Sequence, residues 1–206
     1  MPSLPIRDQM NDHLITPKNS ALLIIDYQPV QVDTIRSMDR EILVDNIVRV
    51  AKCAKAYALP IVLTTVNVKT GINRPMISQL QELDLGMEPI ERTAINAWED
   101  ADFHAAVVAT KRKKLVMCAL WTEVCLAFPA LDALKEGYEV YAVVDAVGGT
   151  TETAHLAGLQ RVTLAGGQPT TWVQLACELQ RDWARTQTVP QFKDIVFGYM
   201  HETIGA

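Results

Sequence analysis

The stretch KLVMCALWTEVCLAFPALDALKEG, from Lys114 to Gly137, decides the fold class of this 206-residue chain. Its apolar run 115–120 has the length and bulk of a buried strand. The run breaks at Trp121, and the leucines that follow have helical spacing up to Gly137. We therefore predict a strand, a tight turn and a helix, which is the repeating unit of a parallel α/β sheet.

Cys125 falls at the predicted turn, within the first turn of the predicted helix. Backbone N–H groups at a helix start lack partners inside the helix, and the helix dipole is positive there. Both effects favour the thiolate, which is the nucleophilic form of cysteine. Free cysteines are nevertheless among the most buried residue types and mostly behave as small hydrophobes. Cys125 is therefore a candidate nucleophile whose role depends on the rest of the chain.

The same alternation of strand and helix runs along the whole chain. Apolar runs predict strands at 20–26, 61–66, 115–120 and 139–144. A short strand or an extended segment is predicted at 89–95, and a last short strand at 168–171. Apolar residues at helical spacing predict helices at 40–58, 100–110, 125–137, 151–165 and 171–186. The polar segment 67–89 is predicted to be a loop, and 187–206 a tail with one or two helical turns. The predicted fold class is α/β: three layers with a mostly parallel, doubly wound sheet.

Length and composition bound the class of protein. With 49% apolar and 21% charged residues, the chain fits one globular domain over 1–206, with an arm at 1–19 and the tail at 187–206. The net charge of -5 and a single basic cluster at 111–114, interpreted as a solvated loop, argue against nucleic-acid binding. No run is long enough to cross a membrane, and the N-terminus lacks a signal-peptide pattern. We expect a cytoplasmic protein with reduced cysteines and no membrane partner.

Asp26 ends the first predicted strand, SALLIID. A continuous apolar run that stops at an acid is typical of a central parallel strand with a functional group at its carboxyl end. Ligands in open α/β sheets bind just beyond these ends, so Asp26 is a candidate site residue. The alternative is a carboxylate that caps a helix or stabilises a turn.

Several common site motifs are absent from the sequence. There is no GxGxxG after the first strand, no Walker P-loop and no GxSxG elbow. The four histidines are far apart, so no local metal cluster is indicated. His155 is the one candidate to pair with Cys125, although a lone histidine in a helix is more often structural.

Several short segments, taken together, resemble the isochorismatase-like cysteine hydrolases, which include nicotinamidases, carbamoylsarcosine amidohydrolase and isochorismatase. The segments are Asp26-Tyr27-Gln28, Trp121-Thr122-Glu123-Val124-Cys125, Ile95-Asn96-Ala97-Trp98, the run TEVCLAFPAL at 122–131, Ala176-Cys177-Glu178-Leu179 and Arg181-Asp182-Trp183. The later segments are similar to the YcaC-type branch, whose hydrolases have no agreed substrate. The resemblance covers about residues 20–186 and implies the isochorismatase-like hydrolase fold, which is Rossmann-like.

The resemblance implies a catalytic aspartate, lysine and cysteine. Asp26 and Cys125 match the first and the last of these. The position of the lysine, a few residues before Ala97-Trp98, holds Arg92, with Glu91 beside it. Arginine supplies positive charge but does not give up its proton. The sequence leaves open whether Arg92 or Glu91 occupies the lysine position.

The mechanism that the resemblance implies is hydrolysis of a small amide or related molecule. Asp26 takes the proton of Cys125, the sulfur attacks the carbonyl carbon, and water then hydrolyses the thioester. The oxyanion hole would use the backbone N–H groups of Trp121 and Cys125, with a cis peptide between Leu120 and Trp121. The predicted substrate-binding residues are Gln28, Asn96, Trp98, Thr122, Phe128 and Trp172. Aromatic residues at such spacings are, however, more often core residues.

Two further expectations follow from the resemblance. Nicotinamidases of this superfamily bind a metal through an acid and histidines, but this chain has no histidine from 14 to 103. We therefore expect neither a metal nor another cofactor, and nicotinamide is a doubtful substrate. Members of the YcaC-type branch form large rings, so we also expect a homo-oligomer with a ring-like assembly.

Two other functions compete with hydrolysis. One is a catalytically silent or weakly active oligomer that binds a small molecule, which the presence of Arg92 in place of lysine favours. The other is a redox protein in which Cys125 reacts and Cys118 or Cys177 approaches in space. Turnover of an amide separates hydrolysis from both.

Overall fold

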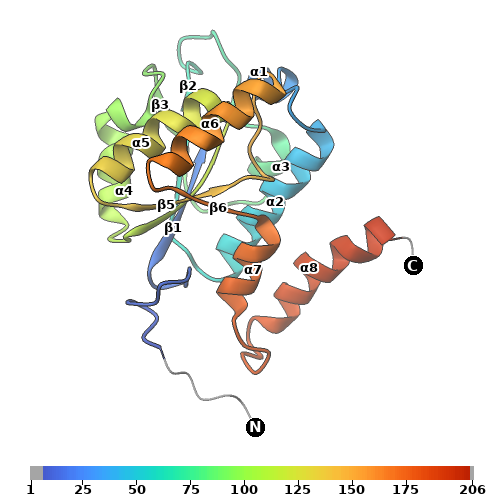
Figure 1. Cartoon of the computed structure of the whole chain (residues 1–206). Coiled ribbons are helices and arrows are strands. Elements are labelled where there is room, and N and C mark those ends of the chain that lie inside the picture. The colour runs from blue at the N-terminus through green and yellow to red at the C-terminus, as the bar shows by residue number, and fades with distance from the viewer. Residues whose placement is uncertain (1–6, 205–206) are drawn as a thin grey trace.

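A computed structural model describes residues 7–204, with side chains described for 7–198. Six parallel strands form one sheet in the order β3-β2-β1-β4-β5-β6 (Figure 1). The strands are β1 Ser20–Ile25, β2 Ile61–Val66, β3 Ile90–Arg92, β4 Lys114–Ala119, β5 Glu139–Val143 and β6 Gln168–Thr170. The predicted parallel, doubly wound sheet is confirmed.

Helices cover both faces of the sheet (Figure 1). One face packs against α4 Ala101–Ala109, α5 Ala127–Lys135 and α6 Glu152–Leu164. The other packs against α2 Arg40–Ala56, α3 Ser78–Gln81, α7 Trp172–Gln180 and α8 Val189–Ile204. Shorter turns complete the chain: α1 Pro29–Asp33, the 3₁₀ turn η1 Ala97–Glu99 and the π-helical turn η2 Thr122–Leu126.

The central strand β1 shows why its sequence is apolar throughout. Leu22 and Ile24 enter the core beneath α2 and α7, whereas Leu23 and Ile25 enter the core beneath α4 and α5. Because successive side chains of a strand point to opposite faces, a strand covered on both faces has no polar side. Each such buried side chain stabilises the fold by about 1.5–3 kcal/mol.

The C-terminal segment differs from the prediction. Helix α7 stops at Gln180 because Arg181 adopts a positive φ of 58°, so Trp183 is 59% exposed instead of pointing inward. The predicted tail instead contains the 16-residue helix α8. Phe192 and Val196 of α8, four residues apart, are buried against the core. This amphipathic spacing was visible in the sequence, but only a partner surface makes it a helix.

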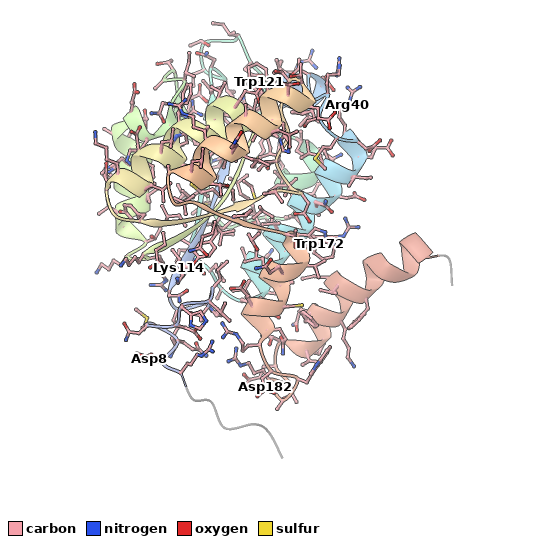
Figure 2. The ribbon with its side chains drawn as sticks, in the orientation of Figure 1. Asp8, Arg40, Lys114, Trp121, Trp172 and Asp182 are labelled. Atoms are coloured by element: carbon pink, nitrogen blue, oxygen red, sulfur yellow. The ribbon has the colours of Figure 1, made fainter. Side chains whose placement is uncertain are left out.

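The prediction of a solvated basic loop at 111–114 is also wrong for its last residue. Lys114 begins β4 and is buried, and its Nζ donates to the hydroxyl of Tyr141 (2.9 Å) and the carbonyl of His13 (3.0 Å). It also pairs with Glu139. Figure 2 shows Lys114 at one end of the sheet and Trp121 at the other, which fixes the direction of β4.

None of the helices in the described part of the chain has the length and apolar content needed to cross a membrane.

Candidate active site

The sheet order places two candidate residues together. The chain proceeds from β1 to β2 on one side and later enters β4 on the other side, so β1 and β4 are neighbours at the point where the strand order reverses. Ligands in doubly wound sheets bind beyond the carboxyl ends of strands at this point. Asp26 directly follows β1, and Cys125 lies in the turn after β4. Their strands are in register, with Ile25 opposite Ala119.

Asp26 leaves the strand in an uncommon backbone conformation. Its φ is 61°, its N–H donates to the carbonyl of Thr64 (3.1 Å), and its side chain is fully buried. A residue other than glycine in the left-handed region costs about 1–3 kcal/mol and persists only where its surroundings hold it. Aspartate is one of the residues that tolerates this conformation.

Arg92, the last residue of β3, forms a buried ion pair with Asp26. Its Nη2 donates to Asp26 Oδ2, and Nη1 donates to the carbonyls of Ala94 and Ile95. The carboxylate of Glu91 instead accepts from the N–H of Lys69 at 3.0 Å. Neighbouring residues of a strand point to opposite faces, so Arg92 and not Glu91 lies beside Asp26.

Cys125 lies in the π-helical turn η2, and the α-helix begins only at Ala127. This corrects the prediction that Cys125 occupies the first turn of the α-helix. Pro129 gives a local reason, because it has no N–H to donate to the carbonyl of Cys125 four residues earlier. Within η2 the N–H of Leu126 donates to the carbonyl of Trp121 five residues earlier (3.1 Å). The peptide between Leu120 and Trp121 is cis.

The thiol of Cys125 and the carboxylate of Asp26 interact directly. Burial, followed by the neighbouring charge of Asp26, raises the pKa of Cys125, and the Arg92 guanidinium only partly opposes this. Burial also raises the pKa of Asp26, although Arg92 lowers it. Desolvation therefore outweighs the helix-start effects that predicted a thiolate. The resting site holds a neutral thiol, 7% exposed as a residue, beside a carboxylate paired with a guanidinium.

The two oxygens of Asp26 have different surroundings. Oδ2 accepts from Arg92, whereas Oδ1 is buried and makes no hydrogen bond within the described residues. The backbone N–H of Trp121 also hydrogen-bonds toward the sulfur of Cys125, which lowers the pKa of the thiol. This arrangement brings a thiol, a carboxylate and a backbone N–H donor together at one point.

His155 contacts the turn η2 through Thr122 rather than through Cys125. Its Nδ1 lies 2.8 Å from the hydroxyl of the fully buried Thr122. The N–H of Thr122 donates to the carbonyl of Gly148 (2.9 Å). Burial lowers the pKa of His155, which favours its neutral form. The histidine therefore helps to fix the turn that carries the thiol.

Helix α6 and the residues just before it hold the same turn at two further points, which the sequence interpretation missed. Glu123 accepts hydrogen bonds from the N–H (3.0 Å) and the hydroxyl (2.6 Å) of Thr150. Gly158 of α6 packs on the turn, since a Cβ there would lie 2.9 Å from the Cα of Glu123. Glycine inside a helix costs about 1 kcal/mol relative to alanine, so its presence in the predicted helix was the available signal.

Three of the predicted substrate-binding residues have other partners. Asn96 donates to Asp132 (2.7 Å), and the indole N–H of Trp98 donates to Glu136 (2.7 Å), so both tie η1 to α5. Trp172 is buried in the core on the opposite face of the sheet from Cys125. These contacts agree with the alternative that the aromatic residues belong to the core and do not bind substrate.

The other predicted substrate-binding residues lie near the ends of β1 and β4. Thr122 belongs to the turn η2, and Phe128 follows Cys125 by three residues, with the guanidinium of Arg161 6.0 Å from its ring centroid. Gln28 is fully buried, and its amide hydrogen-bonds to backbone groups of Val66 and Arg74.

The remaining cysteines do not gather around Cys125. Cys118 is buried in the core beneath α2 and α7, whereas Cys125 is in the core beneath α4 and α5. Cys177 is on α7, on the same side as Cys118. The structure thus places no cysteine of the described residues as a resolving partner in the cluster of Cys125. Among the described residues, no three histidine, cysteine, aspartate or glutamate side chains group together as potential metal ligands.

Comparison with known proteins identifies the family. Residues 20–174 match the family described as the isochorismatase domain. The chain belongs to the isochorismatase family. It is 34% identical to the probable hydrolase YcaC of Escherichia coli over 191 residues, which are 88% of this chain and 91% of that protein.

Solved structures of family members agree with the sheet and its helices. YcaC from Pseudomonas aeruginosa, solved with hexane-2,5-diol and covalent acrylamide, has 32% identity and a TM-score of 0.85, covering 94% of this chain and 98% of that one. YcaC from Escherichia coli, described as an octameric hydrolase of unknown specificity, has 33% identity and a TM-score of 0.81, covering 91% and 97%. A Bacillus subtilis nicotinamidase with 17% identity and a TM-score of 0.61, covering 74% and 99%, shares the fold.

Proposed function

We propose that this member of the isochorismatase family hydrolyses a small amide or a related C–N bond through a thioester at Cys125. The observation that carries the proposal is the buried ion pair of Asp26 and Arg92 beside the Cys125 thiol at the switch point of the sheet. A carboxylate next to a neutral thiol is a base next to a latent nucleophile. Burial raises the pKa of that carboxylate, and Arg92 opposes this by lowering it.

The proposed reaction has two halves. As the sulfur attacks the carbonyl carbon, the thiol proton moves to Asp26 Oδ1, and the oxyanion accepts from the N–H groups of Trp121 and Cys125. The C–N bond then breaks, and the leaving amine takes the proton from Asp26. In the second half Asp26 removes a proton from water, the hydroxide displaces the sulfur from the thioester, and the thiolate is reprotonated.

Two relatives support this chemistry. The Escherichia coli YcaC is named a probable hydrolase. The Pseudomonas aeruginosa YcaC carries covalent acrylamide, which is both a primary amide and an electrophile. Covalent capture requires a reactive nucleophile in that protein, and Cys125 is our candidate for the equivalent role here.

The charges of the site favour a neutral substrate over an acidic one. The Arg92 guanidinium is buried and its charge is already paired with Asp26, so we do not assign it to a substrate carboxylate. A neutral amide with a small acyl group fits such a site better than an acidic one. Thr122 and Phe128 are the residues that we propose to flank it.

The alternative is a family member that binds small molecules with little or no turnover. It is favoured by the raised pKa of Cys125 and by Arg92, which cannot transfer a proton. Under this alternative Cys125 reacts slowly at every pH below its raised pKa, and no amide is consumed.

A panel of neutral amides tests the two against each other. Ammonia release is measured with acetamide, propionamide, acrylamide and nicotinamide, for the wild type and for Asp26→Asn. Hydrolysis is supported by turnover that Asp26→Asn abolishes. Binding of an amide in calorimetry without release of ammonia supports the alternative.

We also propose that the chain forms a homo-oligomer. The proposal is supported by the octameric description of the Escherichia coli YcaC, which resembles this chain over nearly its whole length.

A further inference from the structure

We propose that Gln28 is a positioning residue that holds the Asp26–Arg92 ion pair together, and that it does not bind substrate. The inference rests on the proposed function for the role of that ion pair. Gln28 is one of the residues that the sequence predicts as substrate contacts.

The amide of Gln28 is fully committed to the backbone. Its Oε1 accepts from the N–H of Val66 (2.9 Å), and its Nε2 donates to the carbonyl of Val66 (3.0 Å) and to that of Arg74 (2.7 Å). A primary amide has two N–H donors, and both are used. The side chain is also fully buried, so no donor is left for a ligand.

These contacts close a ring of interactions around the ion pair. Gln28 is two residues from Asp26, and its own N–H donates to the Asp26 carbonyl (2.8 Å). Val66 is the register partner of Arg92 between β2 and β3. The guanidinium of Arg92 then forms the ion pair with Asp26, which closes the ring. Gln28 therefore connects the exit of β1 to the strand pair that delivers Arg92.

The strand that carries Arg92 needs this support. β3 has three residues and lies at the edge of the sheet, so few ladder hydrogen bonds hold it. The adjoining loop is held by the same segment, because Gln28 binds the carbonyl of Arg74 and the carbonyl of Tyr27 accepts from the N–H of Ile77 (2.9 Å). Loss of the Gln28 amide leaves the backbone N–H and carbonyl of Val66 and the carbonyl of Arg74 without a partner. Because unpaired buried groups are costly, we expect these segments to separate from the exit of β1.

The chemistry of the amide makes a sharp variant available. Gln28→Glu keeps the size but places a carboxylate oxygen against the carbonyls of Val66 and Arg74. Gln28→Met keeps the length and removes all three hydrogen bonds. Both variants move β3 away from Asp26, so Asp26 loses part of the stabilisation that Arg92 gives its ionised form.

Alkylation of Cys125 by iodoacetamide measures the consequence without requiring any hydrolysis. Rates are followed by mass spectrometry from pH 4 to 9 in the wild type, Gln28→Glu, Gln28→Met, Arg92→Met and the double variant Gln28→Met/Arg92→Met. We expect the Gln28 variants to slow alkylation at neutral pH by roughly tenfold to a hundredfold, the range for a reacting group displaced by about 1 Å. The acid limb is the pH range in which the alkylation rate falls as Asp26 becomes protonated. We also expect the acid limb of the Gln28 variants to move to higher pH, as in Arg92→Met.

The double variant decides whether Gln28 acts through the ion pair. If it does, adding Gln28→Met to Arg92→Met moves the acid limb no further. The proposal is overturned if both Gln28 variants keep the acid limb of the wild type. It is also overturned if Gln28→Met moves the acid limb as far in the Arg92→Met background as it does in the wild type. A raised KM with unchanged alkylation would instead make Gln28 a substrate contact.

Asn46→Leu is the matched control. Asn46 is also buried and donates its amide to a backbone carbonyl, that of Asp145 after β5 (2.7 Å). It should lower the melting temperature without moving the alkylation limb. Because the assay reads the thiol, an absence of amide turnover would count against the hydrolase and leave this result intact. Gln28→Asn, which keeps the chemistry of the amide, replaces either variant that fails to fold.

Discussion

The buried ion pair of Asp26 and Arg92 controls the site at the scale of single residues. A carboxylate fully removed from water would ordinarily take up a proton, and the guanidinium beside it opposes this. The same pair constrains stability, because removing one partner leaves an uncompensated buried charge. The proposed reaction and the stability of the fold therefore depend on the same two side chains.

Replacing Arg92 tests that coupling. We expect Arg92→Met to lower the free energy of unfolding by about 3–5 kcal/mol. Because Arg92 lowers the pKa of Asp26, its loss raises that pKa, and the acid limb of activity moves to higher pH. Urea unfolding and the pH dependence of kcat/KM measure the two effects. Arg92→Lys, which keeps the charge, should move the limb less; an equal shift in both variants would contradict an electrostatic role.

The proposed nucleophile, Cys125, gives a second prediction at this scale. Cys125→Ser should reduce amide turnover by about a thousandfold or more, the usual effect of removing a catalytic nucleophile. Ammonia release at saturating amide is the measurement. Cys177→Ser is the control, since this exposed thiol lies on α7. Turnover that survives in Cys125→Ser would remove Cys125 from the mechanism.

At the scale of elements, two neighbouring helices shape the turn η2. Pro129 stands in the first turn of α5 and withholds an N–H, while α6 packs on the turn through Gly158. The position of Cys125 is thus a property of the junction between β4, α5 and α6.

Pro129→Ala tests the sequence side of that junction. Alanine supplies the missing N–H, so a regular α-helical bond to the carbonyl of Cys125 becomes available. Because Pro129 is in the first turn, we expect stability to change by less than about 1 kcal/mol. The alkylation rate of Cys125 should nevertheless fall by roughly tenfold because the thiol moves. Unchanged alkylation would show that Pro129 is merely tolerated.

Gly158→Ala tests the tertiary side. The added Cβ would lie 2.9 Å from the Cα and 3.0 Å from the N of Glu123, and backbone atoms cannot rotate away. We expect destabilisation by about 1–3 kcal/mol, typical of overpacking, together with slower alkylation of Cys125. Thermal unfolding and labelling rates measure both. Gly198→Ala in α8 has nothing within 4 Å of its Cβ and should be neutral or stabilising.

At the scale of the whole molecule, the strand order explains why distant residues share one site. Asp26 and Arg92 are 66 residues apart, and they meet because β1, β2 and β3 are parallel and end at the same edge. Assembly belongs to this scale too. Size-exclusion chromatography with light scattering should give a mass that is a multiple of the 22.8-kDa chain. Elution at the mass of one chain would contradict the proposed homo-oligomer.

Sequence patterns alone predict the alternation of strands and helices, the parallel sheet and the candidates Asp26, Arg92 and Cys125. These depend on local signals: apolar runs, helical spacing and short motifs. The choice between Arg92 and Glu91 was beyond these patterns, because the face to which each points depends on the register of β3 with β2.

The environment of these groups depends on how the chain packs. Helix-start effects predicted a thiolate at Cys125, but desolvation by the surrounding core and the neighbouring Asp26 raise its pKa. The amide of Gln28 and the end of α7 at Arg181 likewise depend on partners far away in the chain. Burial and long-range hydrogen bonds are properties of the packed molecule, and no local pattern of residues specifies them.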